Sequence, residues 1–182
     1  MRLPFFLGIT VAALVSSAQQ LPPVPDESNQ FDFWVGHWKV TTPDGKIAGH
    51  NDIKSILGGR VVQENYTTPG LFAGHSYNSY DAGKKRWEQF WVDNSGTALH
   101  LVGGLDDDGQ MILSGERVNP NGETVIDRIT WTPNADGSVR QHWEVSADSR
   151  VSWSTLFDGK YVLVEGPAEL EENFPRQPPS HL

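Results

Sequence analysis

Apolar and polar residues alternate along most of the chain from position 37 to position 165, and no long helical repeat interrupts them. Alternation places successive side chains on opposite faces of a β-strand. The segments are also rich in Val, Ile, Thr, Trp, Tyr and Phe, which suit a pleated, half-buried surface. The pattern predicts strands near residues 37–42, 49–57, 60–67, 73–80, 86–93, 97–104, 110–118, 124–132, 138–146, 150–157 and 160–165.

Turn sequences containing glycine separate many of these strands. Gly accepts the positive φ of tight hairpin turns, and Asn or Asp tolerates it. The predicted turns are Asp44-Gly45, Gly58-Gly59, Asn94-Ser95-Gly96, Asp108-Gly109, Asn121-Gly122, Asp136-Gly137 and Asp158-Gly159. Short sequential connections imply antiparallel neighbours, and a wide sheet avoids exposed edges by closing. We therefore predict an all-β fold, an antiparallel up-and-down, lipocalin-like β-barrel of about 8–11 strands, with a sandwich as the alternative.

The two ends of the chain have a different composition. Met1-Arg2, the apolar stretch 3–15 and the small residues Ser16-Ser17-Ala18 are in the order of a secretory signal peptide. We expect an exported protein, periplasmic or secreted, after cleavage near Ala18. The predicted organisation is a signal peptide (1–18), a Pro-rich linker (19–30), a barrel domain (31–166) and an acidic, Pro-rich tail (167–182). Ser28 is predicted to cap a short N-terminal helical segment that Gly36 ends.

Charge and cysteine content exclude several classes of function. The chain has 23 acidic and 14 basic residues and a formal net charge of -9, which disfavours binding to nucleic acid or to an anionic membrane surface. No second long apolar run follows the first, so we expect no membrane insertion after signal cleavage. The absence of Cys excludes disulfide scaffolds, thiolate zinc sites and cysteine nucleophiles.

Four segments together resemble a known family. They are Phe31-Asp32-Phe33-Trp34-Val35-Gly36-His37-Trp38, Tyr80-Asp81 with 86–93 (RWEQFWVD), 139–146 (VRQHWEVS), and Trp153 with 157–161 (FDGKY). The match covers about residues 30 to 163 and is similar to a family of exported bacterial domains of unknown function that open with an FDFW-x-G-x-W box. The resemblance implies a lipocalin-like (calycin-type) barrel and no common activity. In such barrels Trp38, after Gly36, packs across one end beneath Phe31, Phe33 and Trp34.

Several strands mix aromatic and polar residues on one face, which is typical of a pocket for an amphipathic ligand. We predict ligand contacts from one group of these residues: Tyr77, Gln89, Trp91, His100, Arg128 and Trp153. His142 and Glu144 are the candidate catalytic pair, because residues two apart on a strand point the same way and a carboxylate orients an imidazole. Glu64 and Asp93 are further polar candidates, with a surface ion pair as the simpler interpretation of each.

Neither a metal nor a cofactor is expected. The six histidines have no ligand spacing, and Asp106-Asp107-Asp108-Gly109 lacks the register of a calcium loop. Gly58-Gly59 and Gly103-Gly104 lack the strand-to-helix setting of a phosphate loop.

Three functions remain open at this point. The leading hypothesis is a barrel that binds a small apolar or aromatic molecule in its lumen. The second is a cofactor-independent hydrolase, lyase or isomerase in the same lumen, with His142 or Glu144 carrying protons. The third is a protein-interaction module without a ligand. The sequence does not determine the oligomeric state.

Overall fold

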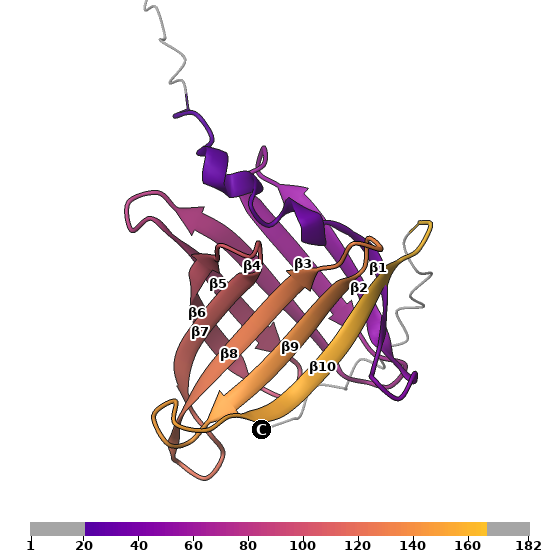
Figure 1. Ribbon diagram of the computed structural model, residues 1–182, viewed down its shortest axis with the longest axis vertical. Coiled ribbons are helices and arrows are strands. Elements are labelled where there is room, and N and C mark those ends of the chain that lie inside the picture. The colour runs from indigo at the N-terminus through magenta and orange to yellow at the C-terminus, as the bar shows by residue number, and fades with distance from the viewer. Residues whose placement is uncertain (1–20, 167–182) are drawn as a thin grey trace, which may run out of the picture.

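Ten antiparallel strands close into one barrel in the computed structural model, which describes residues 21–166 (Figure 1). Each strand pairs with its neighbours in sequence, and β1 pairs with β10 to complete the ring. The strands are β1 (Gly36–Thr41), β2 (Ile47–Ile56), β3 (Val61–Thr67), β4 (Ala73–Asp81), β5 (Arg86–Asp93), β6 (Ala98–Leu105), β7 (Met111–Val118), β8 (Thr124–Pro133), β9 (Val139–Ser146) and β10 (Ser154–Leu163). The predicted all-β, up-and-down barrel is confirmed, and ten strands lie within the expected range.

Two short 3-10 helices precede the barrel, η1 (Asp26–Asn29) and η2 (Asp32–Trp34). The predicted cap is wrong, because Ser28 is a buried residue within η1 and Phe31, the residue before η2, makes no side-chain cap. The signal peptide, its cleavage site and the acidic tail lie outside the described residues. No helix within residues 21–166 is both long and apolar enough to cross a membrane.

The predicted turn at Asp158-Gly159 is wrong, because both residues lie inside the continuous strand β10. Gly159 serves a close approach instead of a turn: a Cβ there would lie 2.6 Å from the ring of Phe157. Asp158 is held on the outer face by Arg140, whose Nε donates to Oδ1 at 2.8 Å. The connection from β9 to β10 lies earlier in the chain, where Ser149 and Arg150 adopt positive φ values of 58° and 76°.

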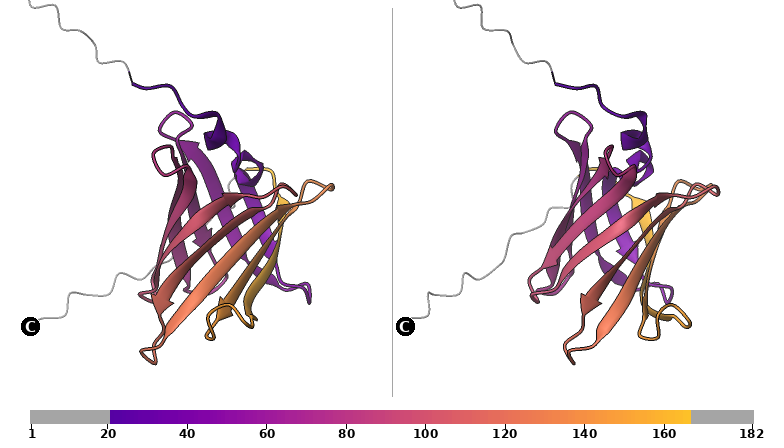
Figure 2. Two further views of the ribbon diagram at one scale, coloured as in Figure 1. Left: turned by 60° about the vertical axis from the view of Figure 1, so that its left-hand side comes forward. Right: turned by 90° about the vertical axis from the view of Figure 1, so that its left-hand side faces the viewer.

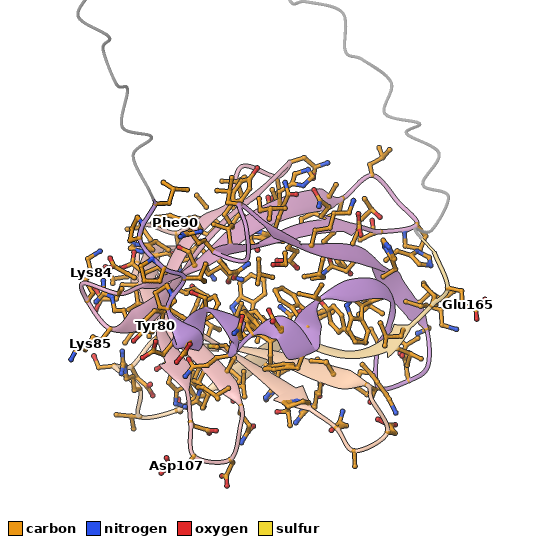
Figure 3. The ribbon with its side chains drawn as sticks, turned by 90° about the horizontal axis from the view of Figure 1, so that it is seen from above. Tyr80, Lys84, Lys85, Phe90, Asp107 and Glu165 are labelled. Atoms are coloured by element: carbon orange, nitrogen blue, oxygen red, sulfur yellow. The ribbon has the colours of Figure 1, made fainter. Side chains whose placement is uncertain are left out.

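Aromatic side chains seal one end of the barrel. Seen from above, the segment that carries η1 and η2 crosses this end (Figure 3), and the side views show it at that end only (Figure 2). Phe31 and Trp34 are fully buried and stack at 4.9 Å between ring centroids. Trp131 packs against both rings, at 5.2 Å from Phe31 and 5.3 Å from Trp34. We call Phe31, Trp34 and Trp131 the seal. Trp38 Nε1 donates to the Trp34 carbonyl at 2.9 Å, and this hydrogen bond connects the start of β1 to the seal.

Candidate functional site

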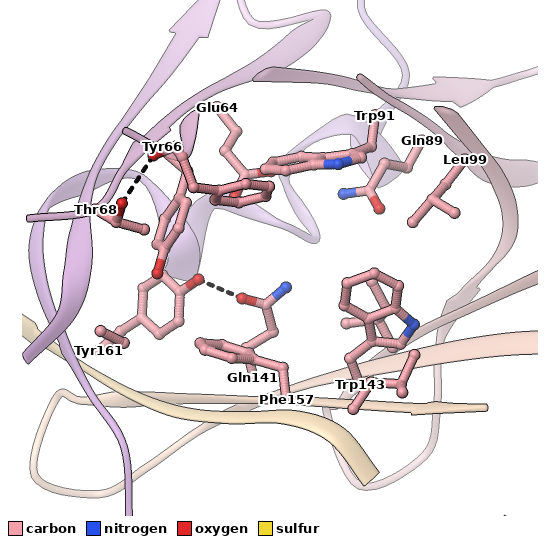
Figure 4. A pocket seen from close by; sticks show the side chains of 14 residues that line it. Glu64, Tyr66, Thr68, Gln89, Trp91, Leu99, Gln141, Trp143, Phe157 and Tyr161 are labelled. Atoms are coloured by element: carbon pink, nitrogen blue, oxygen red, sulfur yellow. Dashed lines mark hydrogen bonds between the residues drawn. The ribbon is translucent and has the colours of Figure 1, made fainter. Parts of the chain in front are cut away.

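A cavity of about 360 Å³ lies in the half of the lumen away from the 3-10 helices. Its residues come from β2, β3, β5, β6, β8, β9 and β10, and from Thr68 and Phe72 in the connection between β3 and β4. Most of its wall is apolar or aromatic, and a few polar groups reach into it (Figure 4). The lining residues are Ala48, Glu64, Tyr66, Thr68, Phe72, Gln89, Trp91, Leu99, Ile129, Gln141, Trp143, Leu156, Phe157 and Tyr161.

Three aromatic rings of this wall lie against glycines. Two of the glycines are on the adjacent strand, and the third is on the same strand as its ring. A Cβ on Gly74 would lie 2.2 Å from the indole of Trp91. A Cβ on Gly49 would lie 2.7 Å from the Tyr66 ring, and the third ring is that of Phe157 over Gly159. Each ring therefore lies directly against backbone, which fixes its position and leaves open volume in the centre of the lumen.

Carboxylates hold the two tryptophans of the wall by their indole N–H groups. Trp91 Nε1 donates to Asp93 Oδ2 at 3.1 Å, and Trp143 Nε1 donates to Asp127 Oδ1 at 2.8 Å. Asp127 is fully buried, and its charge is matched by Arg117, whose Nε lies 2.6 Å from Oδ2. Both indoles thus have one orientation, since a buried N–H without a partner is costly.

A chain of polar side chains runs along the inner faces of β2, β3, β4 and β5. Its centre is Glu64, which is 3% exposed and accepts hydrogen bonds from Asn51 Nδ2 at 2.7 Å and from Ser76 Oγ at 2.6 Å. Asn78 Nδ2 donates to Ser76 Oγ at 3.0 Å, and Gln89 Nε2 donates to Asn78 Oδ1 at 2.8 Å. The network fixes the Glu64 carboxyl and leads from it to the Gln89 amide in the cavity.

Burial controls the protonation of the groups around Glu64. Desolvation raises the pKa of Glu64 to about 7, against the opposing effect of the Ser76 and Asn51 hydrogen bonds. Burial, followed by the negative charge of Glu64, raises the pKa of Tyr66 to about 12. The same two causes raise the pKa of Tyr161 well above its usual value. Near neutral pH both phenols are neutral, and Glu64 is the group whose charge changes.

A further amide, that of Gln141, and the Tyr161 phenol add to the polar part of the cavity. The Tyr161 hydroxyl donates to Gln141 Oε1 from the adjacent strand. Figure 4 shows the Gln89 and Gln141 amides directed into the open centre from opposite walls. The cavity therefore offers hydrogen-bonding groups at a few fixed points on an otherwise apolar surface.

Gln89 and Trp91 are the two predicted ligand contacts that line the cavity. They lie on the inner face of β5 together with Trp87, as the alternation on this strand indicates.

Tyr77 and His100 do not line the cavity, and the expectation that they face the lumen is wrong. The inner face of β4 carries Gly74, Ser76 and Asn78, which leaves Tyr77 52% exposed on the outside. The inner face of β6 carries leucines, and His100 stacks outside on Phe90 at 4.2 Å between ring centroids.

The other four predicted residues come together, but on the outer face of β8, β9 and the β9–β10 connection. Arg128 Nη2 lies 2.9 Å from Glu144 Oε2, and its Cζ lies 3.9 Å above the Trp153 ring. His142 Nδ1 lies 3.7 Å from Glu144 Oε2, and its Nε2 contacts Thr155 Oγ1 at 3.0 Å. The expected lumenal position of His142 and Glu144 is wrong, because Gln141 and Trp143 occupy the inner face of β9.

The sequence analysis missed most of the cavity. Glu64 was a further polar candidate with a surface ion pair as its simpler interpretation, and that simpler interpretation is wrong because Glu64 is buried and lines the cavity. Gln141, Trp143 and Tyr161 were not predicted as contacts, although alternation groups Gln141 with Trp143 on one face of β9. The missing signal was which face of each strand is the inner one.

No three His, Cys, Asp or Glu side chains of residues 21–166 are arranged to hold a metal ion. The cavity wall combines aromatic rings, amides and the Glu64 carboxyl.

Comparison with known proteins gives a family and no activity. No curated protein matches the chain. The profile of a family described as "Protein of unknown function (DUF1579)" matches residues 29–162, which include η2 and all but the last residue of the barrel strands. The chain belongs to the DUF1579 family of proteins of unknown function.

Proposed function

We propose that this protein binds a small, largely apolar or aromatic molecule in the lumen of its barrel, as a lipocalin-like carrier or receptor does. The observation that carries the proposal is the cavity of about 360 Å³, with aromatic walls and a few fixed polar groups. Ligand sites in proteins are commonly concave and apolar, with volumes of about 300–1,000 Å³ and few directed polar groups.

The fixed geometry of the wall supports binding rather than simple core packing. Asp93 and Asp127 hold the indoles of Trp91 and Trp143 in place, and Gly74 lets one of them lie flat against the strand. A lumen that only needed filling would require no such fixing. A preformed wall reduces the entropy lost when a ligand binds.

The test uses N-phenyl-1-naphthylamine, a neutral aromatic dye that fluoresces in apolar sites. We expect one dye per chain, and at least ten-fold weaker binding in Leu99→Trp, because Leu99 lines the cavity and a larger side chain there fills it. The matched control is Val92→Trp, since Val92 is 56% exposed on the outer face of β5. Absence of dye binding, or equal binding by wild type and Leu99→Trp, contradicts the proposal.

We propose in addition that the protein acts outside the cytoplasm. The support is the order of a basic start, a short apolar stretch and small residues ending at Ala18. Mass spectrometry of the protein recovered from an exporting host is expected to give the mass of a chain without residues 1–18. Recovery of the full-length chain from the cytoplasm alone contradicts this proposal.

A further inference from the structure

Three acidic side chains of the described residues are buried, and two of them have cationic partners. Asp127 pairs with Arg117 at 2.6 Å, and Glu88 pairs with Lys84 at 2.8 Å and with Arg86 at 2.9 Å. Glu64 is the third. Its two hydrogen bonds come from the neutral groups of Asn51 and Ser76, and no cationic side chain of residues 21–166 lies within ion-pair distance of it.

Glu64 is also the one buried acid that lines the cavity. Across residues 21–166, the cavity wall includes no Lys, Arg or His that could balance a negative charge there. Beside Glu64, the amide oxygen Oδ1 of Asn51 is buried without a donor. This region therefore has a buried carboxyl and a free amide oxygen, and the cavity wall supplies no positive charge to balance them.

The cavity wall supplies the other part of a site for an organic cation. Trp91, Trp143, Tyr66 and Phe157 contribute aromatic rings around the open space (Figure 4). The faces of aromatic rings carry partial negative charge and attract alkylammonium groups, most strongly where water is excluded. An anionic ligand gains nothing from these rings and is repelled by Glu64.

We infer that the lumenal ligand is a small aromatic or alkyl amine bound as its ammonium ion, with Glu64 as the counter-charge. This inference rests on the proposed function and specifies its ligand class. The ammonium group donates to Glu64 and to neighbouring amide oxygens, while the apolar part of the ligand lies among the rings. Asp127 and Glu88 have cationic partners within the chain, whereas the ligand supplies the cation for Glu64.

The groups that face Glu64 do not change charge near neutral pH, so the effect of the Glu64 charge on ligand binding can be measured by changing the pH. Tyr66 from the same strand and Tyr161 from β10 are the titratable neighbours, and the pKa of each is raised, so both stay neutral. The partners from β2 and β4 are the uncharged Asn51 and Ser76. Glu64, with a pKa raised to about 7, is the group that changes charge between pH 6 and pH 8.

The test compares 2-phenylethylamine with 2-phenylethanol, which has nearly the same shape and no charge, by calorimetry and by displacement of the dye. At pH 8 we expect the amine to bind at least ten-fold more tightly than the alcohol. Amine affinity is expected to rise several-fold from pH 6 to pH 8, because Glu64 loses its proton, while alcohol affinity stays constant. Phenylacetate is expected to bind more weakly than either.

The variant Glu64→Gln removes the charge and keeps the shape, and is expected to reduce amine affinity to that of the alcohol. The exposed Glu116→Gln changes the net charge equally and is expected to behave as wild type. If Glu64→Gln does not fold, the amine–alcohol difference and its pH dependence in the wild type still decide the matter.

Two other outcomes separate this inference from the proposed function. Equal binding of amine and alcohol, both lost in Leu99→Trp, overturns the inference and leaves a lumenal binding protein. Failure of the dye and of every ligand to bind overturns both.

Discussion

Glu64 shows how one residue can make the stability of the barrel depend on pH. Its carboxyl is 3% exposed, and burial raises its pKa from the usual 4.5 to about 7. Between these two values the folded chain retains a proton on Glu64 that the unfolded chain has released. Stability therefore falls as pH rises from about 4.5 to about 7, and this contribution is constant above that range.

The wild-type protein is expected to lose about 3 kcal/mol of unfolding free energy as the pH rises through this range, since each unit of pKa shift corresponds to about 1.4 kcal/mol. Glu64→Gln is expected to remove this loss. Urea unfolding of wild type and variant at pH 4.5 and pH 8 measures it, with Glu116→Gln as the control. The difference between wild type and Glu64→Gln is expected to change over this interval. A difference that stays the same at both pH values contradicts the raised pKa.

At the scale of the element, strand register decides which aromatic rings form the cavity. Gly74 on β4 is near Trp91 on β5, and Gly49 on β2 is near Tyr66 on β3. In each case the ring lies across a glycine of the neighbouring strand, where any side chain would occupy the same space.

Gly74→Ala is therefore expected to displace the indole of Trp91, because the new Cβ would lie 2.2 Å from the ring. We expect a stability loss of about 1–3 kcal/mol, together with a shift in tryptophan emission and weaker dye binding. Gly104→Ala is the control, since a Cβ at that position meets nothing within 4 Å. If both variants behave alike, Gly74 is not required for the position of Trp91.

The strands could be predicted from the sequence because their pattern is local, whereas the cavity depends on which face of each strand is turned inward. Alternation grouped the residues of β5, β6 and β9 correctly by face, because that grouping depends on the local backbone alone. Choosing the inner face depends on the whole barrel. On β4 the inner face is the more polar one, with Ser76 and Asn78, so the expectation of aromatic residues inside placed Tyr77 wrongly.

Glycine and histidine were ambiguous for a similar reason. Gly159 carries the same local signal as a turn glycine, yet it lies in β10 because the ring of Phe157 needs its space. His142 and Glu144 do lie side by side, as their spacing predicts, but a spacing of two residues does not indicate which face of the sheet they occupy.

At the scale of the whole molecule, the barrel has one sealed half and one hollow half. Trp34, Trp38, Trp87 and Trp131 fill the sealed half, whereas Trp91 and Trp143 line the hollow one. The tryptophans of the first group are at most 2% exposed and pack against one another and against Phe31 and Tyr161. The largest fully buried side chains of the barrel are therefore concentrated in the sealed half.

Trp34→Ala is expected to cost about 3–5 kcal/mol of unfolding free energy, because it leaves a large void among buried rings. Trp153→Ala is the comparison, since Trp153 is partly exposed and stacks on Arg128 on the outer face; its expected cost is below about 1 kcal/mol. Urea unfolding of both variants measures the difference. Similar losses in the two variants would show that the seal is not the main source of stability.

The seam between β1 and β10 closes the barrel and completes the wall of its cavity. It consists of four residue pairs, and one of its contacts, from Thr41 to Lys160, joins positions 119 residues apart. The last strand also supplies Phe157 to the cavity and Tyr161 to both halves. A folding chain can form its hairpins in order, but it has no closed lumen until β10 has joined β1. Under the proposed function, a lumenal ligand would stabilise the closed barrel and no earlier intermediate, so the free energy of opening the seam would increase with ligand concentration.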